Sequence, residues 1–294
     1  MIEKLNKCTI CPWECKINRN DEKIGKCRGT NNAKIALVSL HFFEEPCITG
    51  KNGSGTIFFS NCNLKCKFCQ NYEISQYGKG KEITIEELAD IFIEQQKRGA
   101  ENINLVTPTS YAYQIIEAIK IAKKNGLKLP IIYNTNAYEN VETIKALEGY
   151  IDIYLPDFKY MDKKIAKQYS GVEDYPEVAK KAIVEMQKQV GNAQIDNTGI
   201  IRKGLIIRHL ILPNNTENSK QVLKWINDNL PKETYVSVMA QYFPTYLAKK
   251  DKTLNRKISK REYKKVEDYL YSLNIENGYI QDLGDNEECY VPEF

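Results

Sequence analysis

Three closely spaced cysteines place the strongest constraint on this chain. Cys62, Cys66 and Cys69 form a C-x3-C-x2-C pattern directly after the apolar run Thr56-Ile57-Phe58-Phe59. That run predicts a short buried strand, so the cysteines belong to a loop at its carboxyl end, where α/β folds place their chemistry. Thiolates are soft ligands that bind iron–sulfur clusters, copper(I) or zinc. Three of them can bind three irons of a four-iron cluster and leave the fourth iron open to a substrate.

The composition is typical of a soluble globular protein, and its cysteines indicate metal ligation. The 294 residues are 42% hydrophobic and 27% charged, which suits one large α/β domain with small additions. No apolar segment approaches the roughly 18 residues that a membrane span needs, and residues 1–7 contain no run typical of a signal peptide. We therefore expect a cytoplasmic protein without a membrane partner. Nine cysteines in that reducing compartment favour metal binding over disulfides.

Four further cysteines predict a second metal site in the segment 1–34. Cys8, Cys11, Cys15 and Cys27 lie in polar sequence with little apolar material, and such a segment needs a metal to stay folded. Four thiolates satisfy a closed tetrahedral zinc site or a fully ligated iron–sulfur cluster. The spacing does not choose between them. A structural metal is the simplest interpretation; an auxiliary electron-relay cluster, or free cysteines in a loose arm, are the alternatives.

The middle of the chain alternates strands with helices. A strand over 34–40 comes first, and apolar runs then predict strands at 56–59, 103–106, 131–133, 151–155, 204–212 and 235–239, with helices between them. Such alternation implies right-handed parallel βα units. Six strands and five helices predict a partial (β/α)6 barrel over residues 35–245. Residues 246–294 are expected to form a basic linker, a helix and a tail in which Cys289 has no assigned role.

Phe68, the aromatic residue before the third cysteine, completes a pattern that resembles the cluster loop of the radical S-adenosylmethionine (SAM) superfamily. The resemblance implies a [4Fe–4S] cluster on Cys62, Cys66 and Cys69, with SAM on the open iron and Phe68 beside its adenine. It also implies that an electron from the cluster cleaves SAM to methionine and a 5′-deoxyadenosyl radical, which abstracts a hydrogen atom.

Within that superfamily the chain resembles the pyruvate formate-lyase activating enzymes and their uncharacterised relatives with an N-terminal Cys-x2-Cys-Pro segment. The similar stretches are residues 41–47, 55–59, 69–75, 102–108, 152–160 and 208–213. The activases carry Trp-x-Gly-x-Gly-x-Arg before the cluster strand, whereas residues 49–55 here lack the Trp and the Arg. The resemblance therefore implies the chemistry more strongly than the substrate.

The same resemblance assigns SAM-binding residues to the strand ends. Thr107 lies where the methionine amino group binds, although the usual Gly-Gly-Glu is replaced here. Lys159 and Arg208 are assigned to catalysis, because a lysine and an arginine beside a carboxylate suit the orientation of a zwitterion and its leaving group. The remaining cofactor-binding residues are Asn134, Thr135 and Asn136 near the ribose, Asp157 of an Asp-x-Lys motif, and Gln241 in place of a histidine on the sixth strand.

Three functions are consistent with these features. The first is hydrogen abstraction from a protein or peptide substrate, with a flavodoxin or ferredoxin as reductant. The second is radical modification of RNA or a small metabolite. The third is a non-enzymatic iron–sulfur electron-transfer or assembly protein, which the polar strand ends disfavour because a relay needs no such residues.

A basic stretch bears on the second function. The net charge of +4 is too small to imply nucleic-acid binding, but nine basic residues between 249 and 265 face only Asp251 and Glu262. A solvated surface is the simpler interpretation, and a docking patch for RNA or an acidic reductant is the alternative.

Overall fold

The computed structural model describes residues 2–21 and 23–283, so Cys289 and the end of the predicted tail lie outside the described residues. Its sheet follows the order β10-β9-β8-β6-β5-β4-β2-β1-β3. Six neighbouring strands in this order are parallel, which confirms the predicted partial barrel. They are β2 (Ser54–Phe59), β4 (Ile103–Val106), β5 (Ile131–Thr135), β6 (Ile153–Pro156), β8 (Ile201–Leu210) and β9 (Tyr235–Met239).

Shorter strands extend the sheet at both edges. The predicted first strand, β1 (Ala33–His41), is antiparallel to β2 and also pairs with β3 (Lys81–Ile83). At the other edge β10 (Gly278–Ile280) is parallel to β9, and β7 (Gln194–Ile195) pairs with β8. Sequence analysis missed β3, β7 and β10, because two or three residues are too few to show the alternation of a strand.

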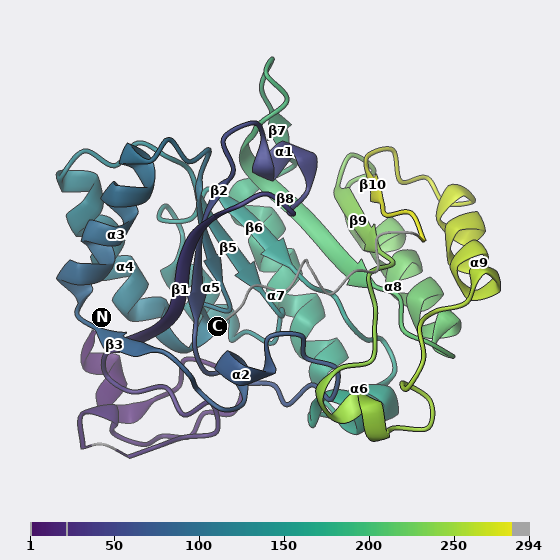
Figure 1. Ribbon diagram of the computed structural model, residues 1–294, viewed down its shortest axis with the longest axis horizontal. Helices are drawn as coiled ribbons and strands as arrows, with labels where there is room; N and C mark the ends of the chain where they lie inside the picture. The colour runs from purple at the N-terminus through teal and green to yellow at the C-terminus, as the bar shows by residue number, and fades with distance from the viewer. Residues whose placement is uncertain (1, 22, 284–294) are drawn as a thin grey trace.

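Helices cover the outer face of the parallel strands (Figure 1). The five that alternate with the strands bury apolar faces; in α3, for example, Leu88, Ala89 and Phe92 are buried. These five are α3 (Ile85–Lys97), α4 (Ala112–Lys124), α5 (Val141–Ala146), α7 (Tyr175–Val190) and α8 (Thr216–Asn229). The others are α1 (Pro46–Thr49), α2 (Tyr72–Ser75), α6 (Lys163–Ser170) and α9 (Lys260–Tyr271), of which α9 packs on α8. Among the described residues, no helix is long and apolar enough to span a membrane.

The N-terminal segment packs against the barrel at its α5 side. It contains the 3-10 helices η1 (Ile2–Lys7) and η2 (Arg19–Asp21) and is drawn in purple in Figure 1. Leu5 and Ile10 are fully buried. The Thr143 hydroxyl donates to the Ile10 carbonyl at 2.7 Å, and the Asn140 amide donates to Thr9 at 2.9 Å. These contacts fix the segment on the first turn of α5.

A capping box at Thr84 begins α3, and it gives a stability test. The Thr84 hydroxyl accepts from the Glu87 amide at 3.1 Å, and Glu87 accepts from the Thr84 amide at 2.7 Å. Thr84→Ala leaves an N-terminal amide of α3 without its partner, so we expect a loss of about 1 kcal/mol in the free energy of unfolding. Chemical denaturation measures it. Thr84→Ser keeps the hydroxyl and is the matched control; equal losses in both variants would contradict the cap.

Candidate active site

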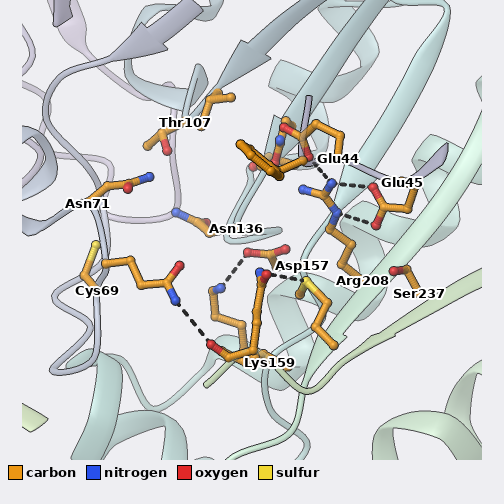
Figure 2. A pocket seen from close by; sticks show the side chains of 18 of the residues that line it. Glu44, Glu45, Cys69, Asn71, Thr107, Asn136, Asp157, Lys159, Arg208 and Ser237 are labelled. Atoms are coloured by element: carbon orange, nitrogen blue, oxygen red, sulfur yellow. Dashed lines mark hydrogen bonds and ion pairs between the residues drawn. The ribbon is translucent and has the colours of Figure 1, made fainter. Parts of the chain in front are cut away.

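The parallel strands end around one cavity of about 470 Å³. Because the strands are parallel neighbours, their carboxyl ends lie at the same edge of the sheet. Every site residue predicted from the strand ends and the cysteine loop lines this cavity, and Figure 2 shows several of their side chains. The lining set includes Cys62, Cys66, Phe68, Cys69, Thr107, Asn134, Thr135, Asn136, Asp157, Lys159, Arg208 and Gln241. The cavity lining does not include the N-terminal cysteines, so the two cysteine groups are separate sites.

The cysteine loop presents three sulfurs, each with a hydrogen-bonding partner. The Leu64 amide donates to Cys62 Sγ at 3.4 Å, and Asn136 Nδ2 donates to the same sulfur at 3.3 Å. The hydroxyls of Ser170 and Ser75 lie 2.9 Å from Cys66 Sγ and 3.1 Å from Cys69 Sγ. Donors aimed at a sulfur stabilise its thiolate and tune the potential of a bound iron–sulfur cluster.

These thiols are suited to metal binding rather than to reactivity as free thiolates. Burial raises the pKa of Cys62 to about 12 and that of Cys69 to about 11, so without a metal both stay protonated near neutral pH. Metal ligation supplies the deprotonation. In the described part of the chain, no three His, Cys, Asp or Glu residues are grouped to hold a single ion. These three hydrogen-bonded sulfurs, two buried and one partly buried, fit a cluster, in which each thiolate binds a different iron.

The ends of β4 and β5 form the polar wall assigned to SAM. Thr107 has a left-handed backbone (φ 60°), a conformation that side chains with a Cβ branch rarely adopt. Its amide donates to the Asn134 carbonyl at 2.9 Å, which ties the two strand ends together. Asn136 is oriented by the Asn63 side chain, to which it donates at 2.9 Å. Neutral amides and hydroxyls held in this way can bind ribose hydroxyls and a zwitterionic headgroup.

A buried carboxyl supports this wall from behind. Glu139 is 1% exposed, and it accepts hydrogen bonds from the hydroxyls of Thr109, at 2.6 Å, and of Thr135. It therefore links the loop after β4 to the end of β5. Sequence reasoning missed Glu139, because it follows a strand by several residues and no pattern marks its direction. Through Thr109 it contacts the segment after β4, where this chain lacks the Gly-Gly-Glu of related radical SAM proteins.

Asp157 and Lys159 of the Asp-x-Lys motif form an ion pair at the end of β6. Lys159 Nζ lies 2.6 Å from Asp157 Oδ2. Burial acts to lower the pKa of Lys159, but Asp157 and the neighbouring Cys66 outweigh it and raise that pKa. Lys159 therefore stays charged beside the cysteine loop, where its ammonium can bind a carboxylate.

Arg208 is held by two carboxylates that sequence reasoning did not assign. Its guanidinium pairs with Glu45 through two nitrogens (Figure 2): Nε lies 2.8 Å from Oε1, and Nη2 donates to Oε2. Nη2 also pairs with the carboxylate of Glu44. Burial opposes ionisation of Glu45, but Arg208 outweighs it and holds the pKa of this carboxyl below its ordinary value. Both glutamates follow β1, and two adjacent acids directly after a strand were the signal available in the sequence. Arg208 is thus already paired, and any further anion must share it with these carboxylates.

The opposite wall comes from the cysteine loop and the end of β9. Phe68 packs edge-on against Tyr242 with ring centroids 6.1 Å apart, and Gln70 donates to the Gln241 carbonyl at 3.5 Å. Gln281, just after the unpredicted β10, donates to the Gln241 side chain at 3.3 Å. The short edge strand therefore positions a predicted cofactor-binding residue.

Comparison with known proteins identifies the family. The chain matches the radical SAM superfamily over residues 56–226. An uncharacterized protein of Methanocaldococcus jannaschii is 31% identical over 279 residues, which cover 92% of this chain and 75% of that protein. The pyruvate formate-lyase-activating enzyme of Clostridium pasteurianum is 24% identical over 199 residues, covering 66% and 76% of the two chains. The chain belongs to the radical SAM superfamily, and membership implies a [4Fe–4S] cluster and SAM as cofactors.

Solved structures share the fold. HydG, a maturase of the [FeFe]-hydrogenase, superposes with a TM-score of 0.51 at 16% identity, over 78% of this chain and 52% of HydG. Streptococcus suis SuiB, solved with its precursor peptide SuiA, gives a TM-score of 0.50 at 16% identity, over 75% of this chain and 46% of SuiB. The chain thus spans about half the length of these two proteins.

Glu139 predicts a pH-dependent stability. Burial raises the pKa of its carboxyl from 4.5 to about 7, so the folded chain favours the neutral form. The contribution of this carboxyl to the free energy of unfolding is then most favourable below pH 4.5. It falls as the pH rises towards 7 and levels off above pH 7, a change on the order of 3 kcal/mol. We expect Glu139→Gln, which cannot ionise, to remove this decline in urea denaturation between pH 5 and pH 8. The exposed Glu148→Gln is the control, and an unchanged decline in Glu139→Gln would contradict the assignment.

Proposed function

We propose that this protein is a radical SAM enzyme of the activating-enzyme type, which abstracts hydrogen from a protein or peptide substrate. One observation carries the proposal: three hydrogen-bonded cysteines, two of them buried, share a single cavity with an ion-paired lysine and a wall of amides and hydroxyls. A cysteine-only metal protein does not need those polar strand ends. The bound cluster and SAM would supply one-electron cleavage and the hydrogen-abstracting radical.

The residues of this chain have distinct tasks in that function. Cys62, Cys66 and Cys69 would hold the cluster, and Phe68 would pack on the adenine. Lys159, kept charged by Asp157, would bind the SAM carboxylate, while Asn134 and Asn136 would contact the ribose.

The case for a protein or peptide substrate rests on the shape of the site and on relatives. Phe42 and Phe43, at the end of β1, are 51% and 55% exposed, and Phe43 also lines the cavity. They give the cavity an apolar rim that a polypeptide could cover. A relative is named for activation of another enzyme, and SuiB was solved with a precursor peptide. A flavodoxin or ferredoxin is the proposed electron donor.

The basic stretch offers less support for RNA. Arg256 pairs with Glu262 at 2.7 Å, and Lys264 lies 3.0 Å from Glu267 and 2.7 Å from Asp268. Several of its charges are thus balanced within the fold, which weakens the patch that RNA would need.

SAM cleavage is the first test. The protein is reconstituted anaerobically with iron and sulfide, supplied with SAM and dithionite, and assayed for 5′-deoxyadenosine and methionine. Both should form, and Cys66→Ser should abolish them because the cluster loses a ligand. Cys47→Ser, a buried cysteine outside the cavity lining, is the matched control. No cleavage by wild-type protein that contains the cluster and binds SAM would refute the proposal.

Lys159 tests the SAM-binding arrangement. Lys159→Met removes the ammonium while keeping most of the volume, so we expect SAM affinity to fall about tenfold or more, equivalent to at least about 1.4 kcal/mol. Isothermal titration of the reconstituted protein measures it. Lys180→Met, which removes a lysine of a surface pair on α7, is the control. Equal affinity in both variants would place the SAM carboxylate elsewhere.

Deuterium transfer tests the substrate class. Candidate proteins and peptides carrying deuterated glycine are added to the active enzyme, and 5′-deoxyadenosine is examined by mass spectrometry. Deuterium in the product supports a polypeptide substrate. Deuterium transfer from a labelled RNA or metabolite pool, with none from polypeptides, would contradict the proposal of a polypeptide substrate.

A further inference from the structure

We propose that Cys8, Cys11, Cys15 and Cys27 bind a second, thiolate-ligated metal centre, that the buried Arg19 balances its negative charge, and that the centre braces the loop of the first cluster. Four thiolates suit an iron–sulfur cluster, in which each thiolate binds a different iron. A single zinc ion fits less well, because no three His, Cys, Asp or Glu residues of the described chain are grouped to hold one ion. The inference does not depend on SAM chemistry.

Backbone hydrogen bonds fold the segment that carries Cys8, Cys11 and Cys15 into one compact unit. The Cys8 amide donates to the Ile17 carbonyl and the Lys16 amide to the Cys8 carbonyl, both at 2.9 Å, so residues 8–17 close on themselves. A turn from Cys11 to Glu14 lies inside this closure. Glu14, Lys16 and Arg28 all have left-handed backbones (φ 38°, 55° and 61°), which is costly for side chains other than glycine. A segment with so little apolar material needs another source of energy to hold such turns.

Two sulfurs of the N-terminal group accept hydrogen bonds from backbone amides, as Cys62 does in the cavity. The Gly29 amide donates to Cys27 Sγ at 3.4 Å, two residues on, as the Leu64 amide does to Cys62 Sγ at the same distance. The Lys26 amide donates to Cys15 Sγ at 3.4 Å. A Cβ added to Gly25 would lie 2.9 Å from Cys15 Sγ, so glycine leaves the space that this sulfur occupies. Backbone donors to sulfur are the outer contacts that stabilise bound thiolates.

Arg19 provides the independent observation. Its side chain is almost fully buried, at 3% exposure, with Nη1 donating to the Ser110 carbonyl at 2.6 Å and Nη2 lying 3.5 Å from Cys27 Sγ. Its Nε has no hydrogen-bond partner, and among the described residues no carboxylate forms an ion pair with it. A guanidinium cannot lose its proton in a protein, and a buried charge needs a counter-charge.

The thiols must therefore supply that counter-charge. Nη2 of Arg19 lies 3.5 Å from Cys27 Sγ, and Cys8 and Tyr111 are the other ionisable groups close to the guanidinium. The Tyr111 hydroxyl is buried and accepts from Asn61 at 2.9 Å, which suits a neutral phenol. Buried thiols ionise when a metal binds them, and four thiolates around zinc or a four-iron cluster keep a net negative charge. A metal centre and Arg19 then neutralise one another in part.

The proposed centre is joined to both sides of Cys62. On one side, Trp13 Nε1 donates to the Asn63 carbonyl at 2.8 Å. On the other, Asn61 Nδ2 donates to the Arg28 carbonyl at 3.3 Å, and the Arg28 guanidinium donates to the Gln76 carbonyl. Asn61 and Asn63 flank the first ligand of the cavity. Loss of the N-terminal centre should therefore loosen the cluster loop.

Metal analysis of a variant without the first site is the test. The triple variant Cys62→Ser, Cys66→Ser, Cys69→Ser is purified without oxygen, and zinc, iron and sulfide are quantified per chain. About one zinc, or about four irons with a similar amount of sulfide, supports the centre and identifies its metal. Less than about a tenth of a metal equivalent of either kind overturns it.

A second variant keeps the proposal testable if the triple variant fails to fold. The double variant Cys11→Ser, Cys27→Ser keeps the first site. Its metal content per chain should fall by the amount that the second centre binds, whereas the metal content of Cys47→Ser should equal that of the wild type. Equal metal content in the two variants would overturn the site.

Arg19→Met tests the charge balance. Without the guanidinium, the centre should release metal to a chelator about tenfold faster or more, since roughly 1.4 kcal/mol of favourable charge pairing corresponds to tenfold. Arg202→Met, which removes an exposed arginine paired with Asp196, is the matched control. Release from Arg19→Met at the control rate would overturn the role of Arg19.

Discussion

Parallel pairing of six strands is the constraint on which the site depends. Each pairing from β2 to β9 keeps the strands in one direction, so the residues that follow them meet at one edge. The first of these segments is the cysteine loop after β2, and the others supply amides, a lysine and an arginine. Because each strand brings one small polar segment, the cavity joins the cysteine loop to residues from across most of the chain.

Burial makes every charge near this edge depend on a partner. Arg208 is matched by Glu44 and Glu45, and Lys159 by Asp157. No cation pairs with Glu139 among the described residues, so burial raises its pKa to about 7 even though the hydroxyls that donate to it act to lower that pKa. Arg19 follows the same rule with sulfurs in place of carboxylates. The balance of buried charge thus connects the cavity and the N-terminal segment through one physical principle.

Most of the barrel could be predicted because its signals are local. Apolar runs marked each of the six parallel strands, and the alternation of strands with helices marked the five helices between them. The strand β10 could not be predicted in this way, since three residues carry no periodicity and its pairing depends on β9. The same holds for Gln281, whose contact with Gln241 exists only after β10 has joined the sheet.

The sequence by itself determined the cluster motif, the order of βα units and the strand-end residues, because spacing and periodicity are properties of neighbouring residues. Only the tertiary structure decided that Glu44 and Glu45 hold Arg208, that Glu139 lies behind the loop after β4, and that Arg19 is buried against Cys27. These partners are between 8 and 164 residues apart, and no local pattern encodes which buried charge meets which. Packing of the whole chain decides which of these groups meet, because a buried ion is stable only beside groups that neutralise it.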